Sequence, residues 1–108
     1  MAETYTAGMW VAKEGEEDQF VEAWRAFVEW AADSQENAGT FRLTREVKDP
    51  RRFFSFAPWP GIEPIQAWKQ SPEFRERIGR VKQHTDDFTA WELELVTAVG
   101  EPAAAAKS

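Results

Sequence analysis

The stretch Thr40–Ala57, TFRLTREVKDPRRFFSFA, decides the fold. Along residues 40–47, apolar and polar side chains largely alternate, which is typical of a strand with one buried face. Lys48–Arg51 supplies turn chemistry, because Asp and Pro both favour a chain reversal. Arg52–Ala57 contains three phenylalanines and reads as the returning strand. The stretch therefore predicts an antiparallel hairpin.

A strand and a helix precede this hairpin. Tyr5–Ala12 alternates as a strand, although both of its faces are largely apolar. An acidic cluster after Gly15 opens a helix, where negative charge interacts favourably with the helix dipole. The buried stripe of that helix is predicted from helical spacing, and a break follows at Glu36–Gly39. The stripe comprises Phe20, Trp24, Phe27, Val28 and Ala31.

A second helix and strand follow the hairpin. Two prolines and a glycine make Pro58–Gly61 a loop, Ile62–Gln70 is helical, and Ser71 restarts the helix as an N-cap. Phe88–Val99 is the last strand, and the tail Glu101–Ser108 is expected to be mobile. The order βαββαβ predicts an α+β, ferredoxin-like fold: a four-stranded antiparallel sheet with helices on one face, in one domain over residues 1–100.

The uncovered sheet face is predicted to mix aromatic and charged side chains. Pairing two such faces would bury the aromatics in a dimeric α/β barrel with interior cavities. The alternative is a monomer with the loop around Trp59 folded across the face. The predicted face contains Trp10, Arg42, Thr44, Glu46, Glu92, Glu94 and either Phe53 or Phe54.

Composition limits the class of protein. The 108 residues are 43% hydrophobic and 30% charged, with no apolar run long enough to span a membrane. The beginning of the chain lacks a secretory pattern and the sequence has no cysteine, so a soluble, cytoplasmic protein is expected. The net charge of -6 argues against nucleic acid and anionic membranes as partners. A small neutral or apolar ligand is favoured.

Two segments carry a resemblance to a known family. Gly8–Ala12 and the helix entry Ala67–Phe74, AWKQSPEF, are similar to the antibiotic biosynthesis monooxygenase family of dimeric α/β-barrel proteins, over roughly residues 6–99. The resemblance implies a homodimer and a cofactor-independent monooxygenase that oxidises a polycyclic, anthrone-like aromatic with O2. It implies no cofactor and no metal.

The resemblance also indicates candidate site residues. Trp68 is expected against the ligand, with the alternative that it only fills the layer between sheet and helices. Arg42 is the candidate holder of the substrate anion, and His84, the only imidazole, is the candidate base. The alternative for His84 is a cation that caps its helix. The candidate substrate-binding residues are Trp10, Trp59 and Phe74.

Two other functions stay open. A non-catalytic member of the family would bind a small molecule or only assemble, and Phe74 favours this reading because it lacks the hydroxyl expected there. A haem-degrading member is less favoured, because the resemblance leads one to expect an asparagine at Gly8 and a histidine at Ile78.

Overall fold

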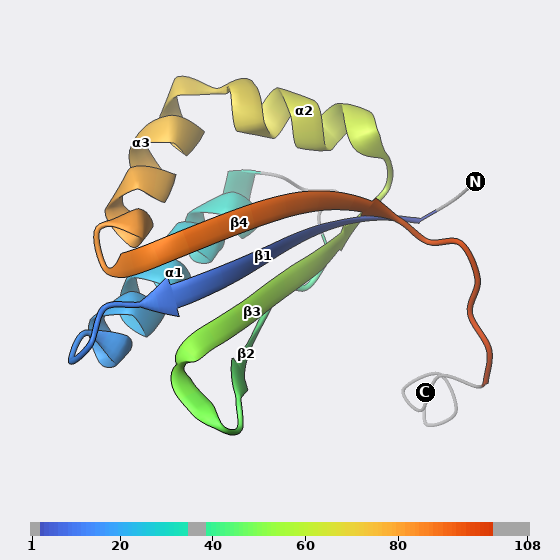
Figure 1. Ribbon diagram of the computed structural model, residues 1–108. Helices are drawn as coiled ribbons and strands as arrows, with labels where there is room; N and C mark the ends of the chain where they lie inside the picture. Colours follow the sequence, from blue (N-terminus) through green and yellow to red (C-terminus); the bar gives the residue numbers. More distant parts are fainter. Residues whose placement is uncertain (1–2, 35–38, 101–108) are drawn as a thin grey trace.

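The computed structural model describes residues 3–34 and 39–100 (Figure 1). Within these ranges the elements follow the predicted order, with the second helical region divided in two. The predicted tail Glu101–Ser108 and most of the predicted break Glu36–Gly39 lie outside the described residues. The elements are β1 (Thr4–Ala12), α1 (Glu17–Ser34), β2 (Arg42–Glu46), β3 (Asp49–Trp59), α2 (Ile62–Gln70), α3 (Pro72–Lys82) and β4 (Thr85–Glu94).

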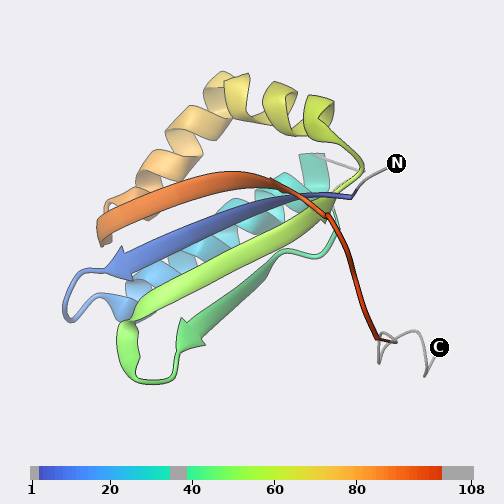
Figure 2. The same cartoon turned by 45° about the vertical axis from the view of Figure 1, so that its right-hand side comes forward.

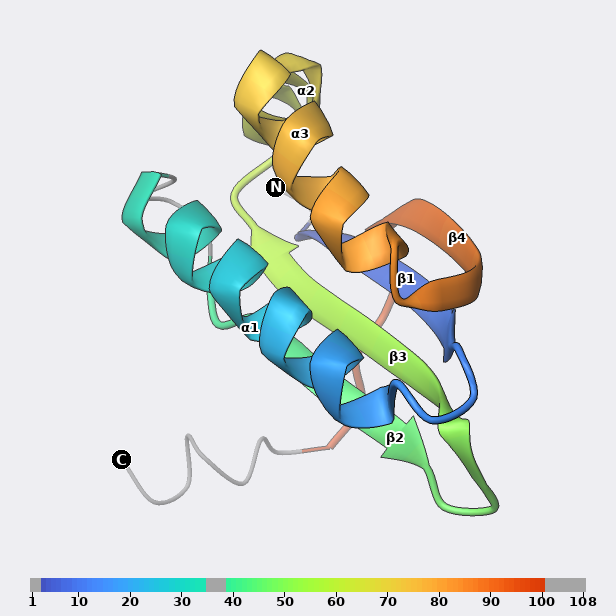
Figure 3. The same cartoon turned by 90° about the vertical axis from the view of Figure 1, so that its left-hand side faces the viewer.

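The four strands form one antiparallel sheet in the order β2-β3-β1-β4. Trp10 in the central strand β1 pairs with Phe53 of β3 on one side and with Phe88 of β4 on the other. Figure 2 and Figure 3 show the helices on the same side of this sheet. The predicted α+β, ferredoxin-like arrangement is therefore confirmed.

Local sequence explains where the helices begin. Glu17 and Asp18 occupy the first turn of α1, where carboxylates offset the partial positive charge of the helix end. At the junction of α2 and α3, the backbone N–H of Phe74 donates to Ser71 Oγ at 3.1 Å, and Pro72 stands at the first helical position. No helix within the described residues is long and apolar enough to cross a membrane.

Strand β3 is longer than predicted and includes Pro58 and Trp59. Gly39 donates its backbone N–H to Pro58 O at 2.9 Å, so the carbonyl of Pro58 faces the side of β2. The nitrogen of a strand residue faces the same side as its carbonyl, and β2 begins only at Arg42. The missing N–H of Pro58 thus costs the sheet no hydrogen bond. The predicted loop Pro58–Gly61 is therefore shorter than expected, since Pro58 and Trp59 belong to β3 and only Pro60 and Gly61 lie outside it.

The predicted composition of the uncovered face needs correction. Trp10 and Phe53 are 3% and 2% exposed and face the helices, because register places them on the inner face. The same register brings Glu92 and Glu94 to the helix side. Alternation along a strand shows which side chains share a face, but not which face the helices cover. Both faces of β1 are apolar, so the sequence pattern wrongly assigned Trp10 to the uncovered face.

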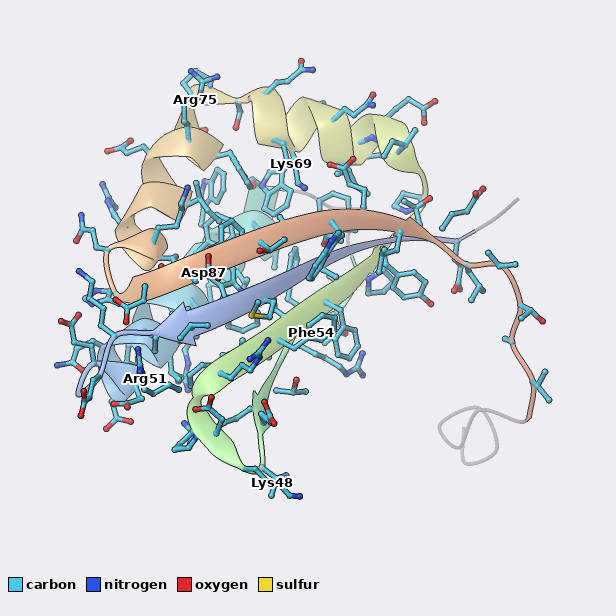
Figure 4. The ribbon with its side chains drawn as sticks, in the orientation of Figure 1. Lys48, Arg51, Phe54, Lys69, Arg75 and Asp87 are labelled. Carbon is cyan, nitrogen blue, oxygen red and sulfur yellow. The ribbon has the colours of Figure 1, made fainter. Side chains whose placement is uncertain are left out.

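The outer face is nevertheless apolar at its centre. Phe54 and Trp91 are 40% and 41% exposed with ring centroids 6.4 Å apart, and Leu93 is also exposed. Figure 4 shows Phe54 on the side of the sheet turned away from α1. Tyr5 donates its hydroxyl to Glu3 Oε1 at 2.6 Å, and this hydrogen bond raises the pKa of the phenol. The predicted Arg42, Thr44 and Glu46 lie on this outer face.

Candidate functional site

A cavity of about 250 Å³ lies between the inner face of the sheet and the helices. Its volume lies just below the range of small-molecule sites, which is about 300–1,000 Å³. Its walls are mainly apolar, and aromatic rings from β1, α1, α2, α3 and β4 contribute much of the surface. These rings include Trp10, Trp24, Phe27, Trp68, Phe74 and Phe88.

Trp68 packs against several aromatic rings. Its ring centroid lies 4.7 Å from that of Phe74 and 5.0 Å from that of Trp59, and the side chain is 4% exposed. Its indole Nε1 is buried and has no hydrogen-bond partner among the described residues. A buried unpaired donor costs about 1–3 kcal/mol. A ligand oxygen that reached this N–H would remove that cost.

Trp10 forms the opposite wall with Phe88, on which it stacks with ring centroids 4.0 Å apart. Its Nε1 donates to Ser55 Oγ at 3.0 Å. Gly8 pairs with Ser55 in the sheet, and a Cβ at Gly8 would lie 3.2 Å from Trp10 Nε1. The glycine therefore leaves room for the indole beside the cavity.

Two lysines bring positive charge to this apolar cavity. Lys69 of α2 lines it and contacts Glu92 Oε2 through Nζ at 3.0 Å. Lys82 at the end of α3 also lines it, with Nζ 5.6 Å from the centroid of Phe88. Figure 4 shows Lys69 between α2 and β4. An anion that forms on a bound ligand would be stabilised by these charges.

The structure brings three predicted site residues together and separates the others. Trp68, Trp10 and Phe74 line the cavity, and Trp59 lies behind Trp68 with its Nε1 donating to Thr6 Oγ1 at 3.1 Å. The support that Trp59 gives to Trp68 is thus structural packing.

Arg42 and His84 do not reach the cavity. Arg42 is exposed on β2 and pairs with Phe56 in register, which places it on the outer face. His84 follows α3, and its Nδ1 lies 3.0 Å from Glu16 Oε1 near the start of α1. The expectation that these two side chains act beside Trp68 is not met by the geometry.

The positions that bear on haem chemistry both line the cavity. Gly8 has no side chain and Ile78 has only hydrocarbon, so neither offers an atom that could ligate iron. The described residues also contain no cluster of three or more side chains of the kind that holds a metal ion.

Sequence reasoning missed four polar residues of the cavity: Thr6, Ser55, Lys69 and Lys82. A signal for Ser55 was present, because it stands two positions from Phe53 and therefore shares its buried face. Lys69 follows Trp68 directly in the quoted helix entry, but a lysine on an amphipathic helix is ordinarily solvent-exposed. The positions of Lys69 and Lys82 at the cavity depend on how α2 and α3 lie over the sheet.

The fold and the cavity define a ferredoxin-like α+β protein with an aromatic-lined cavity between its two layers. The sequence matches the family described as antibiotic biosynthesis monooxygenase over residues 5–79. The chain belongs to that family, as the resemblance implied.

Solved structures support the same fold. SnoaB from Streptomyces nogalater, described as a cofactor-independent oxygenase, is 13% identical with a TM-score of 0.82, covering 94% of this chain and 100% of that chain. A second structure, described as a putative antibiotic biosynthesis monooxygenase from Bordetella bronchiseptica, is 14% identical to this chain with a TM-score of 0.77. The match covers 90% of this chain and 100% of that chain. A comparison with curated proteins finds no match.

Proposed function

We propose that the protein is a cofactor-independent monooxygenase that oxidises a polycyclic, anthrone-like aromatic with O2. The observation that carries this proposal is the buried indole N–H of Trp68, which has no partner among the described residues and belongs to an aromatic-lined cavity. Such a cavity binds a flat aromatic, and such a donor binds its oxygen. The structural similarity to SnoaB, described as a cofactor-independent oxygenase, supports the same assignment.

The reaction requires little covalent chemistry from the protein. A methylene group conjugated with a ketone loses a proton, and the resulting carbanion, delocalised as an enolate, transfers electrons to O2. One oxygen atom becomes the new carbonyl of the product and the other leaves as water, so CH2 and O2 give C=O and H2O. Oxygen is the oxidant and the substrate carbon is oxidised.

The residues of the cavity would favour the anionic form of the substrate. The N–H of Trp68 can donate to the enolate oxygen, and the charges of Lys69 and Lys82 stabilise the anion electrostatically. Lys82 is exposed and therefore lies at the opening of the cavity, where water can accept the proton. The predicted roles of Arg42 as anion holder and His84 as base find no support in this geometry.

The test is the O2-dependent conversion of anthrone to anthraquinone, followed by absorbance and chromatography. Trp68→Phe keeps an aromatic ring but removes the donor, and should lower the rate about 10²-fold, as loss of one oxyanion donor does. Trp30→Phe is the matched control, because Trp30 does not line the cavity and its ring lies against Arg77 of α3. Equal rates in the Trp68 variant and the parent protein would contradict the proposal.

A non-catalytic, small-ligand-binding or assembly protein of the same fold is the second candidate. Phe74, Ile78 and Gly8 line the cavity without offering a hydroxyl, acid or base, which favours this candidate. Native mass spectrometry of the purified protein separates the two. A retained aromatic adduct together with no anthrone turnover would support the binding protein.

The proposal includes a homodimer formed by the outer sheet faces and a cytoplasmic location. Phe54, Trp91 and Leu93 expose large apolar side chains on that face, and a second copy would cover them. The sequence contains no cysteine, so the fold does not depend on a disulfide that a reducing compartment would break. The working unit would be the predicted domain of residues 1–100.

A further inference from the structure

Ser55 is a polar residue in an otherwise aromatic stretch of β3, and it lines the cavity. Its side chain is 9% exposed, between Phe54 and Phe56 in the sequence and opposite Gly8 in the sheet. A hydroxyl that is buried among aromatic rings must form hydrogen bonds to offset its desolvation.

The contact between Trp10 and Ser55 determines which bond the hydroxyl can still form. An indole N–H can only donate, so Ser55 Oγ is the acceptor of the 3.0 Å hydrogen bond from Trp10 Nε1. A serine hydroxyl has one proton to donate. The hydrogen bonds among the described residues include none in which Ser55 Oγ is the donor. The proton therefore remains available at the cavity wall.

We propose that Ser55 is the second hydrogen-bond donor of the cavity and binds an oxygen of the aromatic ligand, with Trp10 as its positioning residue. The proposal rests on the proposed function and narrows the ligand class to fused aromatics that carry two oxygens, as a quinone or a hydroxyketone does. Trp68 Nε1 binds one oxygen and Ser55 Oγ binds the other.

Gly8 keeps the space beside this hydroxyl open. A Cβ on Gly8 would lie 3.3 Å from Ser55 Oγ and 3.2 Å from a ring carbon of Phe88. Any larger side chain would crowd the Ser55 hydroxyl. The glycine thus serves the hydroxyl on β3 as well as the indole on β1.

The experiment measures binding of 1,4-naphthoquinone and naphthalene by equilibrium dialysis. The two probes share their fused rings and differ in the two carbonyl oxygens, and the protein has no cysteine to which the quinone could add. The variants are Ser55→Ala, Trp10→Phe and Ser34→Ala. Ser34→Ala is the matched control, because it removes a hydroxyl that bonds Ala31 O at the end of α1.

The expected result is selective. Ser55→Ala should bind the quinone about three- to tenfold more weakly, the usual effect of one lost neutral hydrogen bond, and should bind naphthalene as the parent does. Ser34→Ala should leave both affinities unchanged. Trp10→Phe keeps a ring on Phe88 but removes part of the cavity wall and frees the Ser55 hydroxyl to rotate. It should therefore weaken quinone binding by a larger factor than naphthalene binding.

Other outcomes would overturn the proposal at different levels. If Ser55→Ala weakens both probes equally or neither, Ser55 only packs, and the proposed monooxygenase function stands without it. If quinone binding in Trp10→Phe equals that of the parent, Trp10 has no positioning role. If the parent protein binds neither probe, the proposal on Ser55 and the proposed function fail together.

Discussion

Lys69 Nζ lies 3.0 Å from Glu92 Oε2, and this contact joins helix α2 to strand β4 beside the cavity. The two side chains are 25% and 39% exposed, so the pair is only partly shielded from solvent. Lys69 directly follows Trp68 in the chain. The ion pair therefore connects the helix that carries the unpartnered indole to the edge of the sheet.

Glu92→Gln should loosen this connection with little change in global stability. Partly exposed ion pairs contribute about 0.2–1 kcal/mol, so ligand release should accelerate about 1.5- to fivefold. Stopped-flow displacement of bound 1,4-naphthoquinone measures the rate, and urea unfolding measures the stability. Glu76→Gln, which breaks the exposed pair with Arg80 on α3, is the control and should leave the release rate unchanged. An unchanged release rate in Glu92→Gln would show that the contact between Lys69 and Glu92 does not control the opening of the cavity.

Gly8→Ala and Gly79→Ala should have opposite effects on the free energy of unfolding. At Gly8 the new methyl group would meet Trp10, Phe88 and Ser55 at 3.2–3.3 Å, and such overpacking costs about 1–3 kcal/mol. At Gly79, inside α3, nothing lies within 4 Å of the added Cβ, so the better helix propensity of alanine should stabilise by about 0.5–1 kcal/mol. Urea unfolding compares the two. Stabilisation by Gly8→Ala would show that the space beside Ser55 is not restricted.

Phe54→Asp should shift the proposed dimer toward monomers. The substitution places a carboxylate in the apolar centre of the outer face, next to Trp91, where a second copy would bury it without a partner. Light scattering coupled to size-exclusion chromatography measures the mass. Val47→Asp is the control, because Val47 is 98% exposed in the turn after β2. If both variants keep the mass of a dimer, the copies associate through another surface.

Ser71→Ala should destabilise the protein by about 1 kcal/mol, the usual cost of a lost N-cap. Ser71 Oγ accepts from Phe74 N at 3.1 Å and donates to Trp68 O at 2.9 Å, so it joins two helices and two cavity residues. Ser71→Asp can still accept from Phe74 N and should recover most of the stability in urea unfolding. Equal free energies of unfolding for all three proteins would mean that the Ser71 cap does not contribute to stability.

The order of elements could be predicted from sequence because each element carries its own local signal. The hairpin at Thr40–Ala57 has alternation and a turn, and Ser71 followed by Pro72 specifies the start of a helix. The end of β3 could not be predicted, because the tolerance of Pro58 depends on where the neighbouring strand β2 begins. That boundary is a property of the sheet and not of the segment.

The site was predictable only in part, for a similar reason. Trp68 and Phe74 were found through the helix entry that resembles the family, and both line the cavity. Trp10 also lines it, but the sequence pattern had placed it on the uncovered face, because alternation does not say which face the helices cover. Arg42 and His84 were chosen for their chemistry alone, and the register of β2 and the end of α3 place them elsewhere.

Strand β4 is an edge of the sheet, since its only sheet neighbour among the described strands is β1. An unpaired edge can recruit strands from other molecules and so begin aggregation, and charged side chains are a common protection against it. Strand β4 carries four carboxylates on this edge: Asp86, Asp87, Glu92 and Glu94. Two copies that approached edge to edge through β4 would repel each other. The same strand that closes one side of the cavity thus discourages uncontrolled growth of the sheet and leaves the outer face as the surface of the proposed dimer.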